Sequence, residues 1–186
     1  DYSEYEKQGL ILEGTGSLVL DRKNNAVFAI ESERTNRILF ERYCDEMKVP
    51  SSNRIFFHAN DENGTPIYHT NVIMSIGNGF AVICSECIES RARREVMTKL
   101  EELRLEIIDI SYAQLKNFCG NILNVKNTNG DTLIVLSASA MWNFEDRQVE
   151  ILQKYGRLVE VSINTIETVG GGSARCMMAE IFLQKK

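Results

Sequence analysis

The chain has 186 residues, enough for one compact domain, and a formal charge of −5 from 21 basic and 26 acidic side chains. The apolar share of 44% and the charged share of 25% are typical of a globular protein rather than a fibrous or disordered one. The acidic balance argues against a broad nucleic-acid surface, and no apolar run reaches the roughly 18–20 residues that span a bilayer. We therefore expect a single domain that binds neither nucleic acid nor membrane.

Five cysteines occur at irregular spacings, and their number is odd: Cys44, Cys84, Cys87, Cys119 and Cys176. A secreted disulfide framework normally has an even count, so we expect a reducing, cytoplasmic location. Cys84 and Cys87 have the spacing of a redox or zinc site, but no second such pair and no paired histidines accompany them. We favour a structural role for this pair, with a reversible disulfide as the weaker alternative.

The first predicted unit covers residues 9–66. Its strands are expected at 9–13, 17–21, 26–30 and 54–58, with a turn at 23–25. Before the last of these strands, Ser32 or Thr35 is suited to cap a helix that runs to about Val49, where Pro50 ends it.

Two further units follow at 67–111 and 112–163. In the second, strands at 71–76 and 80–84 flank a Gly-Asn-Gly turn, and an amphipathic helix from Ser90 to Arg104 leads to a strand at 106–110. In the third, strands at 121–125 and 132–136 precede a helix that Asn143 caps and Gly156 ends, and a strand at 158–161 follows. A partial fourth unit, 164–186, is expected to end in a strand at 177–183 and to contain no helix.

The repeated order is strand, strand, helix, strand, and each helix can bury its apolar face only against neighbouring units. Three and a half units suit an incomplete ring better than a closed one. The start at Asp1, without a Met, points the same way. We therefore expect one α/β domain over residues 1–186 that lacks an N-terminal portion.

Cys176 follows a Gly-Gly-Gly-Ser-Ala-Arg run that includes Gly172. A glycine run lets backbone approach a ligand closely, so this cysteine is either a nucleophile at the rim of a site or a buried structural residue.

Two histidines and two charged residues complete the candidates. His69 lies at the entry to a strand, where functional residues are common, whereas His58 lies in an apolar strand and is interpreted as a half-buried structural residue. Glu13 precedes a Gly-Thr-Gly turn that could aim its carboxylate into a site or leave it in solvent. Arg34 is interpreted locally as an ion-pair partner at a helix start.

Five blocks, taken in order, resemble the guanidine-modifying (pentein) superfamily: Leu-Glu13-Gly, Ser-Glu-Arg34-Thr, His69-Thr-Asn71, Gly120-Asn121 and Gly-Gly-Gly-Ser-Ala-Arg-Cys176-Met. This superfamily contains arginine deiminases, dimethylarginine dimethylaminohydrolases and amidinotransferases. The chain is most similar to the amidinotransferase-like branch that includes citrulline-utilising hydrolases. The resemblance runs from about residue 9 to the C-terminus. It implies an α/β propeller of five ββαβ units, here an incomplete ring.

The resemblance also implies roles for single residues. Cys176 corresponds to the nucleophile that attacks the guanidinium or ureido carbon, and His69 to the general acid and base. Glu13 corresponds to the carboxylate that binds the substrate nitrogens, and Arg34 to the arginine that pairs with the substrate α-carboxylate. For Asn121 the resemblance implies no role. No metal or organic cofactor is implied, because a thiolate and an imidazole suffice for this chemistry.

Asn71 stands where arginine deiminases carry an Asp, and the lost carboxylate favours a neutral ureido group such as citrulline. We expect Asn71 and Gly172 to bind substrate. The leading hypothesis is a C–N hydrolase of a guanidino or ureido amino acid, with citrulline or arginine ahead of methylated arginine. An amidinotransferase that uses the same intermediate and a non-catalytic binding protein are the alternatives. A noncovalently held N-terminal fragment and a homo-oligomer are further expectations.

Overall fold

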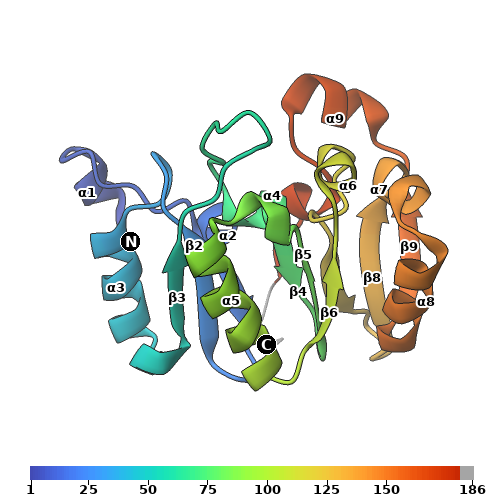
Figure 1. Ribbon diagram of the computed structural model, residues 1–186, viewed down its shortest axis with the longest axis horizontal. Coiled ribbons are helices and arrows are strands. Elements are labelled where there is room, and N and C mark those ends of the chain that lie inside the picture. The colour runs from blue at the N-terminus through green and yellow to red at the C-terminus, as the bar shows by residue number, and fades with distance from the viewer. Residues whose placement is uncertain (181–186) are drawn as a thin grey trace.

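The strands form three separate three-stranded sheets that lie side by side in this computed structural model, which describes residues 1–180 (Figure 1). The sheets contain, in order, β1 (Val19–Asp21), β2 (Ala26–Ile30) and β3 (Arg54–Phe57); β4 (Met74–Ile76), β5 (Phe80–Ile83) and β6 (Glu106–Asp109); and β7 (Leu123–Lys126), β8 (Thr132–Ser137) and β9 (Arg157–Val161). In each sheet the first two strands are antiparallel and the last two parallel.

Helices make the crossover between the two parallel strands of every sheet, as a parallel connection requires. These helices are α3 (Arg37–Glu46), α5 (Ser90–Glu102), and the pair α7 (Ala138–Asn143) and α8 (Asp146–Tyr155). Figure 1 shows α3, α5 and α8 beside their own sheets. The order strand, strand, helix, strand that the sequence predicts is therefore confirmed in all three sheets.

The core lies on the middle strands, because each has a neighbour on both edges and side chains packed on both faces. All five residues of β2 and all four of β5 are buried. Helix α5 contributes Val96 and Leu100, which have 1% and 0% of their surface exposed. Each such side chain removed from water contributes about 1.5–3 kcal/mol to stability.

One predicted strand is absent, and the predicted N-terminal caps of two helices are wrong. The strand expected at 9–13 is absent except for a single bridge between Leu12 and Thr35, because no neighbouring strand runs beside it. Helix α3 is capped by Asn36, whose side chain accepts a hydrogen bond from the Ile38 amide. Helix α8 is capped not by Asn143, which ends α7, but by Glu145 in a capping box.

Short helices account for other differences. The segment expected as a strand from Asn71 begins with a helical turn, α4 (Thr70–Ile73), before β4. The expected absence of a helix after residue 164 is wrong, since α9 spans Asn164–Gly170. The predicted strand at 177–183 begins in a 3₁₀ turn, η3 (Ala174–Met177), residues 178–180 are not strand, and 181–183 lie outside the described residues.

The remaining helices of the described chain are short: α1 (Ser3–Glu6), α2 (Gly14–Ser17) and α6 (Tyr112–Lys116), with 3₁₀ turns η1 (Ser51–Asn53) and η2 (Ser85–Cys87). Among residues 1–180, none of the helices has both the length and the apolar character to cross a bilayer.

Candidate active site

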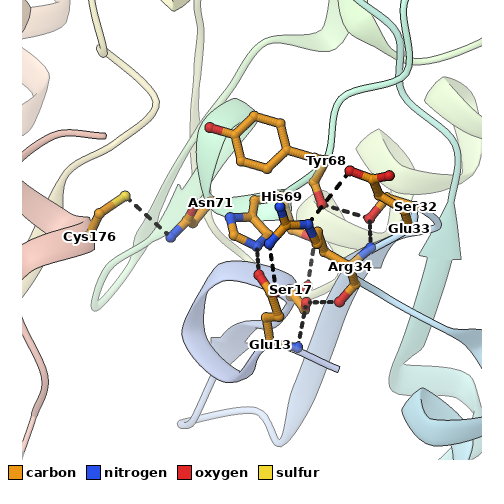
Figure 2. Close-up of polar contacts among 10 residues, drawn as sticks. Glu13, Ser17, Ser32, Glu33, Arg34, Tyr68, His69, Asn71 and Cys176 are labelled. Carbon is orange, nitrogen blue, oxygen red and sulfur yellow. Dashed lines mark hydrogen bonds and ion pairs between the residues drawn. The ribbon is translucent and has the colours of Figure 1, made fainter. Parts of the chain in front are cut away.

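The candidate residues come from segments that immediately precede the first strand of a sheet. Glu13 lies just before α2 and β1, His69 just before α4 and β4, and Asn121 just before β7. Cys176 lies in η3, which packs against β8. Because the sheets lie side by side and α2 contacts α4, residues far apart in the sequence meet at one place. Figure 2 shows this region.

Glu13 links a histidine and an arginine. One carboxylate oxygen lies 2.6 Å from His69 Nε2, and the other accepts a hydrogen bond of 2.8 Å from Arg34 Nη1. Burial alone would raise the pKa of Glu13, but the hydrogen bonds from Arg34 and His69 outweigh it and hold that pKa below its usual value. Glu13 is therefore ionised near neutral pH and acts only as an acceptor.

The ionised Glu13 sets the tautomer of His69. Since the carboxylate only accepts, Nε2 carries the proton that it shares with Glu13, and Nδ1 is the nitrogen left to exchange a proton with a ligand. The ring lies directly against the backbone of Gly16, where an added Cβ would fall 2.8 Å from an imidazole carbon. A glycine is thus required at this position for the ring to reach Glu13.

A buried hydroxyl network holds the two short helices together. Thr70 Oγ1 donates to the Ser17 carbonyl at 2.6 Å and accepts from the Ile30 amide at 2.8 Å. The Ser17 hydroxyl donates to the Arg34 carbonyl and accepts from the Glu13 amide. Ser17 and Thr70 are fully buried. Our sequence analysis missed both residues, although their place next to Glu13 and His69 was a usable signal.

Cys176 is exposed, whereas the other four cysteines are buried and free. Its Sγ lies 3.2 Å from Nδ2 of Asn121 and 3.8 Å from Nδ2 of Asn71. Burial raises the pKa of Cys44 to about 11 and that of Cys119 to about 12, so these thiols are unreactive at neutral pH. Cys176 is the accessible thiol of the chain.

The asparagines are themselves fixed by the backbone. Asn121 is 3% exposed and its Nδ2 also donates to the Asn71 carbonyl at 3.0 Å. This contact depends on Gly120, because a Cβ there would lie 2.5 Å from the Val72 carbonyl oxygen. Asn71 is also 3% exposed, and its Oδ1 has no hydrogen-bond partner among the described residues.

A buried carboxylate anchors the loop that carries Cys176. Glu167 on α9 accepts hydrogen bonds of 2.6 Å from Ser173, in the loop, and of 2.6 Å from Ser139, on α7. Burial alone would raise the pKa of Glu167, but hydrogen bonds from serines, including these two, lower it. Gly172 lies beside Cys176, with an added Cβ 3.6 Å from the Cys176 sulfur.

The predicted site residues thus form two groups: Glu13, His69 and Arg34, and Asn71 with Cys176. No hydrogen bond within the described chain joins Cys176 to His69, and α4 connects the groups because Asn71 follows His69 by two residues (Figure 2).

Two other sequence interpretations concern residues outside the site. His58 is exposed and pairs with Glu31 at 3.3 Å, so its interpretation as half-buried is wrong. Cys84 and Cys87 are buried and do not form a disulfide. No cluster of three metal-ligating side chains occurs among residues 1–180.

A profile of the family described as N,N dimethylarginine dimethylhydrolase, eukaryotic, matches residues 1–183. No curated protein sequence matches the chain. The fold resembles apo ArgZ, an arginine dihydrolase from the ornithine–ammonia cycle in cyanobacteria, with 18% identity and a TM-score of 0.71 over 91% of this chain and 24% of that one.

Two further structures are similar. The N-terminal domain of ArgZ bound to substrate has 17% identity and a TM-score of 0.68, over 90% of this chain and 56% of that one. AgrE in complex with ornithine and NAD⁺ has 22% identity and a TM-score of 0.66, over 90% of this chain and 22% of that one. The chain therefore spans about a quarter of these full-length proteins.

Fold and sequence together place the chain in the guanidine-modifying (pentein) superfamily. Within it, the chain belongs to the family of eukaryotic N,N dimethylarginine dimethylhydrolases.

Proposed function

We propose that the chain carries the catalytic groups of a hydrolase that cleaves a C–N bond of a guanidino or ureido amino acid. The observation that carries this proposal is the short Glu13–His69 contact of 2.6 Å close to an exposed thiol that two side-chain amides face. A nucleophile, an acid–base group and an orienting carboxylate are what such a reaction needs.

In the first step the Cys176 thiolate attacks the guanidino or ureido carbon and forms a C–S bond. The C–N bond to the leaving amine then breaks, and His69 supplies a proton to that nitrogen, so that the amine departs neutral. A thiouronium or thiocarbamoyl adduct on the sulfur results. Asn121 lies within hydrogen-bond reach of Sγ and stabilises the anionic sulfur before attack.

In the second step His69 takes a proton from water, and the resulting hydroxide attacks the adduct carbon. Collapse releases the cysteine as a thiolate, which completes the cycle without oxidation or reduction. Glu13, whose carboxylate remains ionised, keeps His69 oriented through the short contact with Nε2. The Arg34 side chain is 47% exposed although it pairs with Glu13 through Nη1 and with Glu33 through Nε, so its exposed part is available to the substrate α-carboxylate.

The surroundings of Cys176 support a neutral ureido substrate such as citrulline. The side chains in contact with Sγ are amides, and no carboxylate of the described chain touches the sulfur. A cationic guanidinium is stabilised by carboxylates, whereas a ureido oxygen that becomes negative during attack is stabilised by N–H donors. The unpartnered Oδ1 of Asn71 is available to accept an N–H of the same substrate.

The test is alkylation by 2-chloroacetamidine followed by intact-mass and peptide analysis. We expect one adduct, on Cys176, and none on a Cys176→Ala variant. Turnover of citrulline, arginine and dimethylarginine is then compared through amine release, and we expect the highest kcat/KM for citrulline. Adducts spread over several cysteines, with no turnover of any of the three, would favour a non-catalytic protein. A higher kcat/KM for dimethylarginine would retain the hydrolase and overturn the ureido preference.

Other parts of the proposal concern the larger assembly. We infer that the three sheets are blades of a five-unit α/β propeller, with units at about 9–66, 67–111, 112–163 and 164–186. An additional polypeptide segment that supplies the remaining units, and association of two copies, stay predictions. Five free cysteines support a reducing compartment such as the cytoplasm.

A further inference from the structure

A cavity of about 780 Å³ lies between the first strands of the three sheets and η3. Leu20 of β1, Ile76 of β4 and Leu123 of β7 form part of its wall, and Arg175 of η3 closes one side. Glu13, His69 and Cys176 do not line it. The cavity is therefore separate from the candidate active site, although Arg175 precedes Cys176 in the sequence.

Arg175 is buried, and one of its nitrogens is unpartnered. Only 9% of its surface is exposed, and its Nε has no hydrogen-bond partner among residues 1–180. Among the described residues Glu180 is near enough to favour its charged form, but this attraction does not offset the effect of burial. Burial lowers the pKa of Arg175 to about 10, so the guanidinium is still protonated at neutral pH. A buried charge of this kind is costly unless something of opposite charge approaches it.

The rest of the cavity wall is basic rather than acidic on balance. Lys23 and Lys126 line it together with Arg22. Of the two acidic residues on the wall, Asp21 already accepts hydrogen bonds from the Lys23 and Asn24 amides. The other, Glu180, lies 3.8 Å from Arg22.

We propose that this cavity is a binding site for a small oxyanion, a carboxylate or a phosphate, anchored by Arg175. The planar guanidinium carries several N–H donors in a fixed fork that matches two oxygens of such a group. The lysines on the wall add positive charge around the same space. Apolar strand residues on the wall, such as Leu20 and Leu123, lower the local polarity, which strengthens a charged hydrogen bond.

The test is thermal unfolding of the full chain in sodium phosphate, sodium acetate or sodium chloride at equal ionic strength and pH 7.5. We expect phosphate, acetate or both to raise the Tm by about 2–4 °C relative to chloride. Phosphate stabilises most proteins weakly because it is excluded from their surface. Binding at the cavity is therefore measured by the difference between the Tm shift of the wild type and that of a variant without Arg175. If this difference appears with acetate the ligand is a carboxylate, and if it appears with phosphate the ligand is a phosphate.

Two variants separate the explanations. Arg175→Met should lose the anion-dependent shift, and in chloride it should unfold no earlier than the wild type, because an uncompensated charge is gone. Arg91→Met is the matched control, since Arg91 is 90% exposed on α5, and it should keep the shift. Equal anion shifts in Arg175→Met and wild type would overturn the proposal.

A second measurement needs no variant. Calorimetric titration of phosphate and of acetate into the wild-type chain should give saturable heat for at least one of them, and its absence for both would also overturn the site. Neither experiment measures turnover, so failure here leaves the proposed hydrolase untouched.

Discussion

The side-chain amide of Asn121 joins the sulfur of Cys176 to the backbone of the segment that carries His69. Its Nδ2 lies 3.2 Å from Sγ and 3.0 Å from the Asn71 carbonyl oxygen. An amide N–H directed at a sulfur stabilises the thiolate over the thiol, because the charge-assisted hydrogen bond is the stronger one. Asn121 is therefore placed to act on the reactivity of the Cys176 thiol.

Replacement of Asn121 by Ala should slow alkylation of Cys176 by 2-chloroacetamidine by about tenfold or more at neutral pH, since a hydrogen bond to a charged group contributes about 1.5–3 kcal/mol. Asn121→Asp should slow it further, because a carboxylate repels the thiolate. The second-order rate constant from quenched time points gives the measurement. Asn129→Ala, in an exposed turn, is the control and should react as the wild type. An unchanged rate in both Asn121 variants would remove this role.

Gly16→Ala should push the His69 ring away from Glu13, since the new methyl group would lie within 2.9 Å of both ring nitrogens. We expect kcat for the preferred substrate to fall by about tenfold to a hundredfold, the usual contribution of a positioned general acid or base. KM should change much less. Gly170→Ala adds the same methyl group where the nearest atom is 3.9 Å away, and it should leave kcat unchanged. Equal effects of the two substitutions would contradict this account of His69.

Glu13→Gln should reduce stability in a pH-dependent way. The folded state lowers the pKa of Glu13 below the ordinary value of 4.5, so the ionised form is favoured by folding. Its contribution is complete above pH 4.5 and is lost as the pH falls through the lowered folded-state pKa. Urea unfolding of wild type and variant should therefore differ at pH 7 and converge at lower pH. A difference that persists or grows under acid would be inconsistent with the ion pair.

Glu167→Gln should loosen the loop that carries Cys176. Glu167 is 7% exposed and accepts from serines on both sides, so the loss of its charge should cost about 1–3 kcal/mol of unfolding free energy, measured in urea. Ser173→Ala, which removes only the loop contact, should also slow alkylation of Cys176. Glu160→Gln, on the exposed face of β9, should change neither quantity. If Ser173→Ala alkylates at the wild-type rate, the loop does not depend on this contact.

Sequence patterns captured the sheets because each middle strand is a continuous apolar run, as in β2 and β5. The same patterns did not predict the first residue of a helix correctly where that residue depends on which side chain forms the N-terminal cap. Asn36 caps α3 although Ser32 and Thr35 are equally suited by residue type, and Thr35 is instead buried. Which of the three residues caps the helix depends on the position of the preceding loop, and the local sequence does not determine that position.

For the site, the resemblance supplied Cys176, His69 and Glu13 but not how they are held. The contact of Glu13 with His69 joins residues 56 positions apart, and that of Asn121 with Cys176 joins residues 55 apart. Such pairs depend on how elements far apart in the sequence pack against one another. Composition and periodicity describe single elements, so they carry no information about those distances.

The contacts that join the parts of the site to one another cross from one strand–helix unit to the next. Glu13 meets His69 across the junction of the first two sheets, and Asn71 meets Asn121 across the next. A folding intermediate in which the third sheet has formed but has not docked would retain its own strand pairing and α8. In that species Cys176 and Asn121, which both lie on the third sheet, would be separated from Asn71 and from the Glu13–His69 pair. Recovery of selective alkylation during refolding would therefore report docking of the sheets rather than formation of secondary structure, and should lag behind the far-ultraviolet circular dichroism signal.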